Sequence, residues 1–118
     1  MFMRSTMWVV AAFWMTIGSC FGQAYPSKPV RILTAGAGGG NDILARALAQ
    51  EISPRLGVAV IVDNRASSLL AGNLVSAPPD GHTLLVWSTA IWTQTLAQKM
   101  SYDPTRDIAY ISLLTIAP

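Results

Sequence analysis

The sequence is poor in the side chains that carry most protein chemistry. Its 118 residues include one cysteine, one histidine and only 12% charged residues. A transition-metal site usually draws its ligands from several cysteines and histidines, so we expect no metal site. The one cysteine, Cys20, precedes the part expected to fold, which excludes an intrachain disulfide. A nucleophile paired with a base is equally poorly supplied, and we expect neither an enzyme nor a bound cofactor.

Charge of one sign is not concentrated anywhere either. Beyond residue 24 the chain carries seven lysines and arginines against six aspartates and glutamates, so it is close to neutral. Nucleic acids and anionic membrane surfaces attract dense basic patches, and this sequence has none. We therefore expect no nucleic acid partner.

The N-terminus has the three-part order of an export signal. Arg4 supplies a cation, Met7–Gly18 is an almost unbroken apolar run, and small residues stand three positions and one position ahead of a cut before Tyr25. A helix that spans a bilayer needs about 20 apolar residues, and this run is shorter. We predict a signal peptide over residues 1–24 and one small domain over residues 25–118.

Cys20 has a second interpretation. Residues 17–20 resemble a bacterial lipobox, in which the cysteine is lipidated and becomes the new N-terminus. The alternative is a small side chain near the end of an apolar core, and the ordinary cleavage site at residues 22–24 favours this alternative. A membrane tether is therefore expected only if Cys20 is lipidated.

Short β-type runs alternate with helix-type segments from residue 30 onward. Strands are predicted at 30–34, 58–62 and 83–87, and a fourth strand, or a segment leading into one, at 109–116. Helices are predicted from an N-cap at Asn41 to an end between Pro54 and Gly57, at 69–75 and at 93–100.

The order and spacing of these runs predict the fold class. The run at 58–62 is apolar throughout, as in a strand covered on both faces, and residues 63–65 are expected to turn the chain. The first three strands start 28 and 25 residues apart, which is typical of βαβ units. We therefore predict an α/β fold with a parallel sheet and flanking helices on both faces.

Ligands of such sheets bind beyond the carboxyl ends of the strands. Here those ends are the segments 35–42, 63–68 and 88–92. The first is rich in glycine and precedes a helix, whose N-terminus offers unpaired N–H groups and the positive end of a dipole. It could hold a small anion, such as a carboxylate or a phosphate, or it could be a glycine-rich turn without a ligand.

A nucleotide-dependent enzyme is the main alternative. Gly36-x-Gly38-x-x-Asn41 is close to the dinucleotide-binding motif, and Asp63 ends a strand where a ribose-binding acid would lie. However, Asn41 replaces the third glycine of that motif. His82, next to a turn, is expected to lie at a strand edge rather than act as a base. Trp87 and Trp92 are expected to pack in the core rather than line a pocket.

Several blocks in a fixed order resemble the substrate-binding proteins of tripartite tricarboxylate transporters, also called the Bug family. Each block is weak by itself, but their order and spacing behind a signal peptide are specific. The blocks are residues 26–32 (PSKPVRI), 38–46 (GGGNDILAR), 60–65 (VIVDNR), and 79–85 (PDGHTLL) with 102–107 (YDPTRD).

The resemblance implies a type II periplasmic-binding-protein fold, in which two α/β lobes close over a carboxylate-bearing solute. In that family the loop after the first strand holds a ligand carboxylate through backbone amides and bridging waters. The matching residues here are Gly38, Gly39, Gly40 and Asn41, with Asp42 as a side chain that selects among ligands. Ser88 and Thr89, after the third strand, would supply hydroxyls.

The sequence departs from the family pattern in four respects. Ala35 and Ala37 stand where prolines are common, and residues 66–70 replace a glycine-rich stretch. His82 stands where an aromatic residue is usual. Family members are also much longer, so residues 25–118 are expected to form a truncated first lobe.

The resemblance therefore predicts a periplasmic solute-binding component of a tripartite transporter. Its partners would be a small carboxylate and the integral membrane subunits of that transporter. A nucleotide-dependent exported enzyme and a non-functional gene fragment remain as alternatives.

Overall fold

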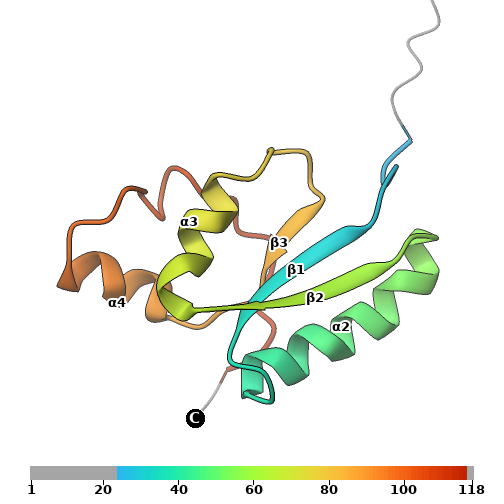
Figure 1. The fold of residues 1–118 in the computed structure, drawn as a ribbon, viewed down its shortest axis with the longest axis horizontal. Coiled ribbons are helices and arrows are strands. Elements are labelled where there is room, and N and C mark those ends of the chain that lie inside the picture. The colour runs from blue at the N-terminus through green and yellow to red at the C-terminus, as the bar shows by residue number, and fades with distance from the viewer. Residues whose placement is uncertain (1–23, 117–118) are drawn as a thin grey trace, which may run out of the picture.

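Three parallel strands form one sheet in the part of the chain that the computed structural model describes, residues 24–116 (Figure 1). The central strand pairs through Ile32 with Val62 on one side and with Leu84 on the other. The predicted parallel sheet is confirmed. The strands, in their order across the sheet, are β2 (Val60–Arg65), β1 (Val30–Ala35) and β3 (Thr83–Leu85).

Helix α2 (Gly40–Leu56) covers one face of this sheet (Figure 1). Its alanines Ala45 and Ala49 are buried, and with Ile32 of β1 they form the first core cluster. Because these helix residues are small, the helix backbone can approach the sheet closely. This packing fixes where the N-terminus of α2 lies relative to the end of β1.

The ends of α2 differ from the prediction. Gly39 is the N-cap, in an extended conformation with φ −77° and ψ 168°, and Asn41 is already the second helical residue. The predicted N-cap at Asn41 was therefore wrong, because the extended Gly39 starts the helix without a side-chain cap. At the other end Gly57, with φ 71°, terminates the helix as predicted, while Pro54 lies inside the last turn. Proline there removes only one N–H close to the helix end.

Two further helices and a 3-10 turn lie on the opposite side of the sheet from α2 (Figure 1). They contribute Ala71 and Ile91 to a second core cluster, with Tyr102 and the partly buried Trp87. Helices on both faces and a core position for Trp87 are thus confirmed, whereas the predicted core position of Trp92 was wrong, because Trp92 is 40% exposed. The 3-10 turn is η1 (Ser67–Leu69), and the helices are α3 (Leu70–Val75) and α4 (Ala90–Ala97).

Helix α4 begins earlier and ends earlier than the predicted 93–100. The carbonyl oxygen of Ser88 accepts a hydrogen bond from Ile91, and that of Thr89 accepts from Trp92, so the first helical turn forms at residues 88–92. Among residues 24–116, the helices are all too short or too polar to cross a membrane.

Strand β2 corrects two further predictions. Residues 63–65 do not turn the chain but continue the strand, pairing with Leu33, Thr34 and Ala35 of β1. Polar side chains are tolerated there because β2 lies at the edge of the sheet. The strand is also not covered on both faces, since Ile61 is 52% exposed. α2 shields only one of its faces.

The apolar segment 109–116 forms no strand in the described part of the chain. Ile111 and Ile116 are exposed, and Tyr110 stacks on Trp92 with ring centroids 5.6 Å apart. An apolar pattern alone does not make a strand, because a strand needs a hydrogen-bonding neighbour. Likewise the third strand ends at Leu85 rather than at the predicted Trp87.

The two isoleucines Ile32 and Ile61 provide a matched test of this core. Ile32 is 1% exposed at the centre of the sheet, whereas Ile61 is 52% exposed at its edge. Ile32→Ala should lower the free energy of unfolding by about 2–5 kcal/mol, and Ile61→Ala by about 0.5 kcal/mol or less. Urea unfolding followed by circular dichroism measures both. Equal losses would contradict the described packing.

Candidate functional site

Two of the three segments singled out for ligand binding, 35–42 and 88–92, follow the carboxyl ends of neighbouring strands. Residues 36–39 connect β1 to α2, and residues 86–89 connect β3 to α4. Because β1 and β3 are parallel neighbours, their carboxyl ends lie side by side. The fold therefore brings the glycine loop, defined as residues 36–39, to the same end of the sheet as Ser88 and Thr89.

The glycine loop has a backbone that needs glycine. Gly36 and Gly38 have φ angles of 47° and 82°, a conformation that other residues adopt at a cost. The N–H of Gly39 donates to the carbonyl oxygen of Gly36 over 2.9 Å. A Cβ on Gly39 would lie 3.1 Å from that same oxygen, whereas one on Gly40 would meet nothing within 4 Å.

The N–H groups at this loop divide into two sets. Those of Gly38 and Gly39 are used inside the protein, by the Asp42 carboxylate and by the Gly36 carbonyl oxygen respectively. The first intrahelical bond is that of Ile43, whose N–H donates to Gly39. The N–H groups of Gly40, Asn41 and Asp42 therefore lack helical partners, and within residues 24–116 no side-chain cap bonds to them. These three groups are the donors that the site offers to an anion.

Asp42 lies in the first turn of α2 and is only 3% exposed. One carboxylate oxygen accepts from Gly38 N–H at 2.8 Å and from Arg46 Nε at 3.0 Å. The other accepts from Asn64 Nδ2 at 2.9 Å. The bond from Arg46, with those from Gly38 and Asn64, lowers the pKa of Asp42 from 3.8 to about 2. The carboxylate is thus ionised at neutral pH and directed into the protein.

The remaining predicted site residues are more accessible. Asn41 is half-buried, and Ser88 and Thr89 are exposed. The Ser88 hydroxyl lies 3.4 Å from the N–H of Ala90, at the start of α4. Both hydroxyls thus stand at a second helix N-terminus, where an anion would also be favoured.

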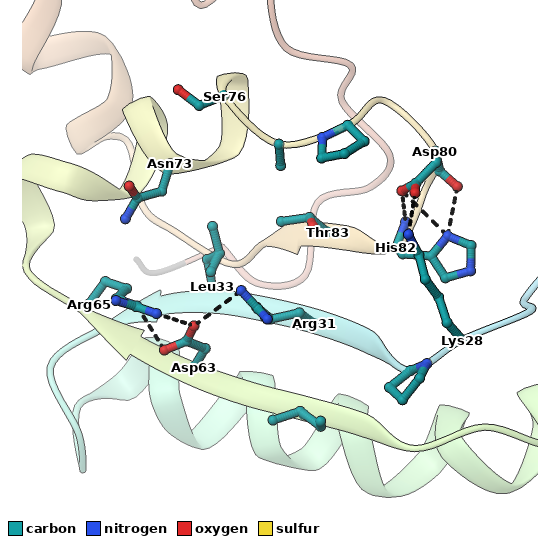
Figure 2. A pocket seen from close by; sticks show the side chains of 14 residues that line it. Lys28, Arg31, Leu33, Asp63, Arg65, Asn73, Ser76, Asp80, His82 and Thr83 are labelled. Carbon is teal, nitrogen blue, oxygen red and sulfur yellow. Dashed lines mark hydrogen bonds and ion pairs between the residues drawn. The ribbon is translucent and has the colours of Figure 1, made fainter.

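A groove on the sheet face opposite α2 was not foreseen from the sequence. It encloses about 670 Å³ and is lined by side chains of all three strands, of α3 and of the loop after α3 (Figure 2). Arg65 binds Asp63 through two hydrogen bonds of 2.9 and 3.0 Å, and Arg31 lies 3.9 Å from Asp63 on the other side. The sequence signal for this charged face was Arg31, which stands between the apolar residues Val30 and Ile32 and so points to the opposite face of the sheet from them.

The position of Asp63 bears on the alternative of a dinucleotide-binding site, which needs an acidic residue at the end of β2 to bind a ribose. Asp63 is the residue at the end of β2 that could hold a ribose, but two arginines hold its carboxylate in the groove. The neighbouring Asn64, not Asp63, reaches the start of α2. Among the described residues, no group of three or more histidines, cysteines, aspartates or glutamates gathers as in a metal site.

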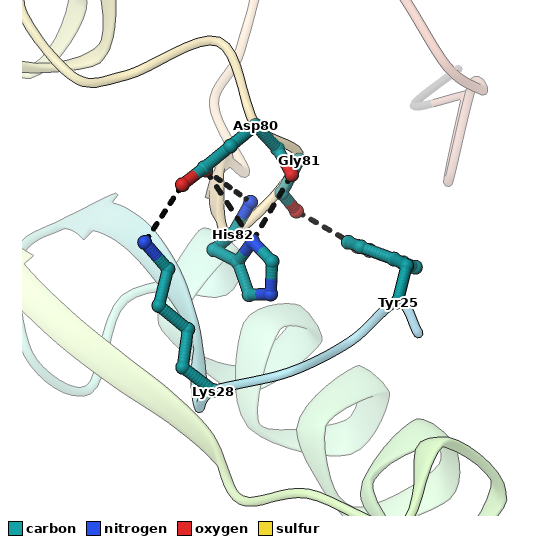
Figure 3. A network of polar contacts seen from close by, with 5 residues as sticks. All are labelled: Tyr25, Lys28, Asp80, Gly81 and His82. Carbon is teal, nitrogen blue, oxygen red and sulfur yellow. Dashed lines mark hydrogen bonds and ion pairs between the residues drawn. The ribbon is translucent and has the colours of Figure 1, made fainter. Parts of the chain in front are cut away.

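A third polar cluster ties the start of the described chain to the turn before β3 (Figure 3). Lys28 Nζ lies 2.7 Å from the Asp80 carboxylate, and the Tyr25 hydroxyl donates to the Gly81 carbonyl oxygen over 2.8 Å. His82 is buried beside Tyr25, with Nδ1 3.0 Å from the backbone oxygen of Asp80. His82 therefore packs within the turn next to β3, as predicted for a strand edge.

Comparison with known proteins identifies the family. Residues 44–118 match the family described as the tripartite tricarboxylate transporter family receptor. The chain belongs to this family. The resemblance inferred from the sequence blocks is thereby confirmed, and the family is one of receptors rather than enzymes.

Individual relatives agree with this assignment. A UPF0065 protein of Agrobacterium vitis, encoded in the TAR-I ttuE-ttuC' intergenic region, is 39% identical over 101 residues, 81% of this chain and 29% of the relative. BugT of Bordetella pertussis is 28% identical over 106 residues, 81% of this chain and 32% of BugT. The chain thus spans about a third of the length of these curated relatives.

A solved structure described as that of a periplasmic transporter resembles this fold. The two share 38% sequence identity and a TM-score of 0.50 over 52% of this chain and 22% of the other. This likeness confirms the predicted α/β fold of the periplasmic-binding-protein type.

Alanine substitutions at Gly38 and Gly40 test the loop geometry. Gly38→Ala should lower the free energy of unfolding by about 1–2 kcal/mol, because its φ of 82° strains any residue with a Cβ. Gly40→Ala should change it by about 0.5 kcal/mol or less, since space is open there. Urea unfolding of both variants checks this, and a Gly40→Ala loss as large as that of Gly38→Ala would contradict it.

The Lys28–Asp80 ion pair predicts an acid dependence of stability. The hydrogen bond from Lys28, with a backbone bond from His82, lowers the pKa of Asp80 from 3.8 to about 2. A depressed pKa stabilises the fold above about pH 4, and this contribution is lost as the pH falls from about 4 towards 2. Asp80→Asn should therefore make the decline of the unfolding free energy over this range shallower. It should not abolish the decline, because Asp42 titrates in the same range.

Urea titrations at several pH values between 5 and 2.5 would measure that slope. Glu51→Gln, which removes an exposed carboxylate from α2, is the control for the loss of one negative charge. Equal slopes for Asp80→Asn and Glu51→Gln would refute the role given to Asp80.

Proposed function

We propose that this chain supplies the carboxylate-binding edge of a periplasmic solute-binding protein that serves a tripartite tricarboxylate-type transporter. The observation that supports this most directly is the set of three N–H groups at the start of α2 that have no partner among the described residues, next to a loop in which Gly36 and Gly38 have positive φ angles. Membership of the receptor family supports the class of function.

The ligand carboxylate would sit on the N–H groups of Gly40 and Asn41, with Asp42 N–H beside them. The helix dipole places about half a positive charge there, which favours a negative ligand. Ser88 and Thr89 would donate hydroxyl hydrogen bonds from the neighbouring helix start. Gly38 and Gly39 would shape the loop rather than donate to the ligand, since their N–H groups are bonded within the protein.

A complete receptor would add a second lobe that closes over the ligand, which excludes water and strengthens these hydrogen bonds. Residues 1–24 would direct the protein to the periplasm, where it passes its solute to the integral membrane subunits. The mature protein would begin at Tyr25 and be free, or begin at a lipidated Cys20 and be tethered to a membrane.

Two substitutions at Gly40 isolate the contribution of a single N–H group. Proline is favoured at the first helical position, and Gly39 already has the extended conformation required before proline. Gly40→Pro should therefore preserve the helix start but delete the donor, while Gly40→Ala adds a Cβ and keeps the donor. A hydrogen bond to a charged group contributes about 1.5–3 kcal/mol, so Gly40→Pro should bind at least about tenfold more weakly than Gly40→Ala.

Isothermal titration of the full protein with succinate, citrate and NAD would measure this difference. Binding of succinate or citrate with the expected gap between the two variants supports the proposal. Binding of NAD alone would support the nucleotide-dependent enzyme instead. Equal carboxylate affinity in the two variants would place the ligand away from the start of α2.

A further inference from the structure

The Asp42 carboxylate belongs to a closed ring of three side chains. Arg46 donates from Nε to Asp42 at 3.0 Å and from Nη2 to Asn64 Oδ1 at 3.2 Å. Asn64 completes the ring by donating from Nδ2 to Asp42 at 2.9 Å. The ring joins α2 to β2, since Asn64 lies 18 residues after Arg46 and 22 residues after Asp42 in the sequence.

The ring also holds the glycine loop. Within residues 24–116, the hydrogen bond from Gly38 N–H to Asp42, 2.8 Å long, is the one side-chain bond that residues 36–39 receive. Glycine backbones lose more freedom on ordering than any other residue. Without this bond, two backbone bonds would restrain the loop within the described residues: the one from Gly39 to Gly36 and the one from Ile43 to Gly39 at the start of α2. Asp42 therefore fixes the loop that lies directly before the free N–H groups.

The charge of Asp42 would normally oppose the proposed ligand. A carboxylate in the first turn sits close to the amides that would bind a second carboxylate, and like charges repel. Arg46 forms an ion pair with Asp42 at 3.0 Å, and Asn64 and Gly38 supply two more donors to it. With both oxygens engaged inside the protein, Asp42 can anchor the loop while the outer N–H groups stay available to an anion.

We propose that Asp42, Arg46 and Asn64 are positioning residues that hold the glycine loop and aim the N-terminus of α2 at the ligand. This inference rests on the proposed function, and it gives Asp42 an indirect role in place of the direct selection of ligands implied by the family resemblance. The Asp42 side chain binds the loop and does not touch the ligand.

The ring allows a rescue experiment, because its charge can be moved without breaking its bonds. Asp42→Asn leaves Arg46 without its counter-charge. In the double variant Asp42→Asn with Asn64→Asp, the amide oxygen introduced on α2 would accept from Gly38 and Arg46, and the amide nitrogen beside it would donate to the new carboxylate on β2. That carboxylate would also accept from Arg46 Nη2. The net charge and the number of ring bonds equal those of the original protein.

The full protein, its two single variants and the double variant are titrated with succinate and citrate. Asp42→Asn should weaken the binding of the recognised carboxylate about tenfold or more, and the double variant should restore it to within about threefold. An unchanged affinity of Asp42→Asn overturns the proposal. Failure of the folded double variant to recover also overturns it, since a carboxylate at position 42 itself would then be required. If Asp42→Asn does not fold, the double variant compared with the original protein gives the same decision.

A second readout does not depend on any ligand. Hydrogen exchange of the Gly38 amide, followed by nuclear magnetic resonance, should be about tenfold faster in Asp42→Ala, which deletes the acceptor, as expected for the loss of a bond of about 1.4 kcal/mol. It should stay slow in the double variant, whose amide oxygen at position 42 accepts from Gly38. If no carboxylate binds the original protein, the proposed function fails, but the exchange rate of the Gly38 amide still tests whether the ring holds the loop. Unchanged exchange at Gly38 in Asp42→Ala would show that the ring does not hold the loop.

Discussion

The hydrogen bond between the Asp42 carboxylate and the Gly38 N–H connects the parts of this structure that matter for binding. It fixes a glycine loop to the helix that follows, and through Asn64 it fixes both to strand β2. Burying a carboxylate normally destabilises a protein, because the charge loses its hydration. Here Arg46, Asn64 and a backbone amide donate hydrogen bonds to it, and the start of a helix favours negative charge. The geometry of the loop, and so the direction of the free amides, depends on this one group.

The sheet separates two kinds of surface. On the α2 face, small and branched apolar side chains such as Ala45 and Ile32 form a tight core. On the opposite face, Arg31, Asp63 and Arg65 line an open groove between the strands and α3. Alternating side chains along β1 and β2 create this division, because successive residues point to opposite faces. The candidate site lies at the carboxyl ends of β1 and β3, where both faces of the sheet end.

The sequence predictions succeeded where the signal was local and failed where the structure depends on contacts between distant segments. The parallel strands and the glycine loop were predictable because spacing, β-branched runs and glycines act locally. Residues 63–65 misled because Asp, Asn and Arg are typical of turns, yet their backbone groups pair with residues 33–35. Residues 109–116 misled in the opposite direction, since their apolar character suggested a strand that has no partner in the described part of the chain. In the site, glycine content identified the loop but not which of its amides are already bonded.

The sequence by itself determined the family, the order of strands and helices, and the place of the glycine loop before a helix. These properties follow from residue types and their spacing along the chain. Only the tertiary structure decided that Asp42 faces inward, that Asn64 of β2 bonds to it, and that the amides of residues 40–42 have no partner among the described residues. The physical reason is that a hydrogen bond depends on distance and direction in space, and residues 22 positions apart acquire these only when the strand and the helix pack together.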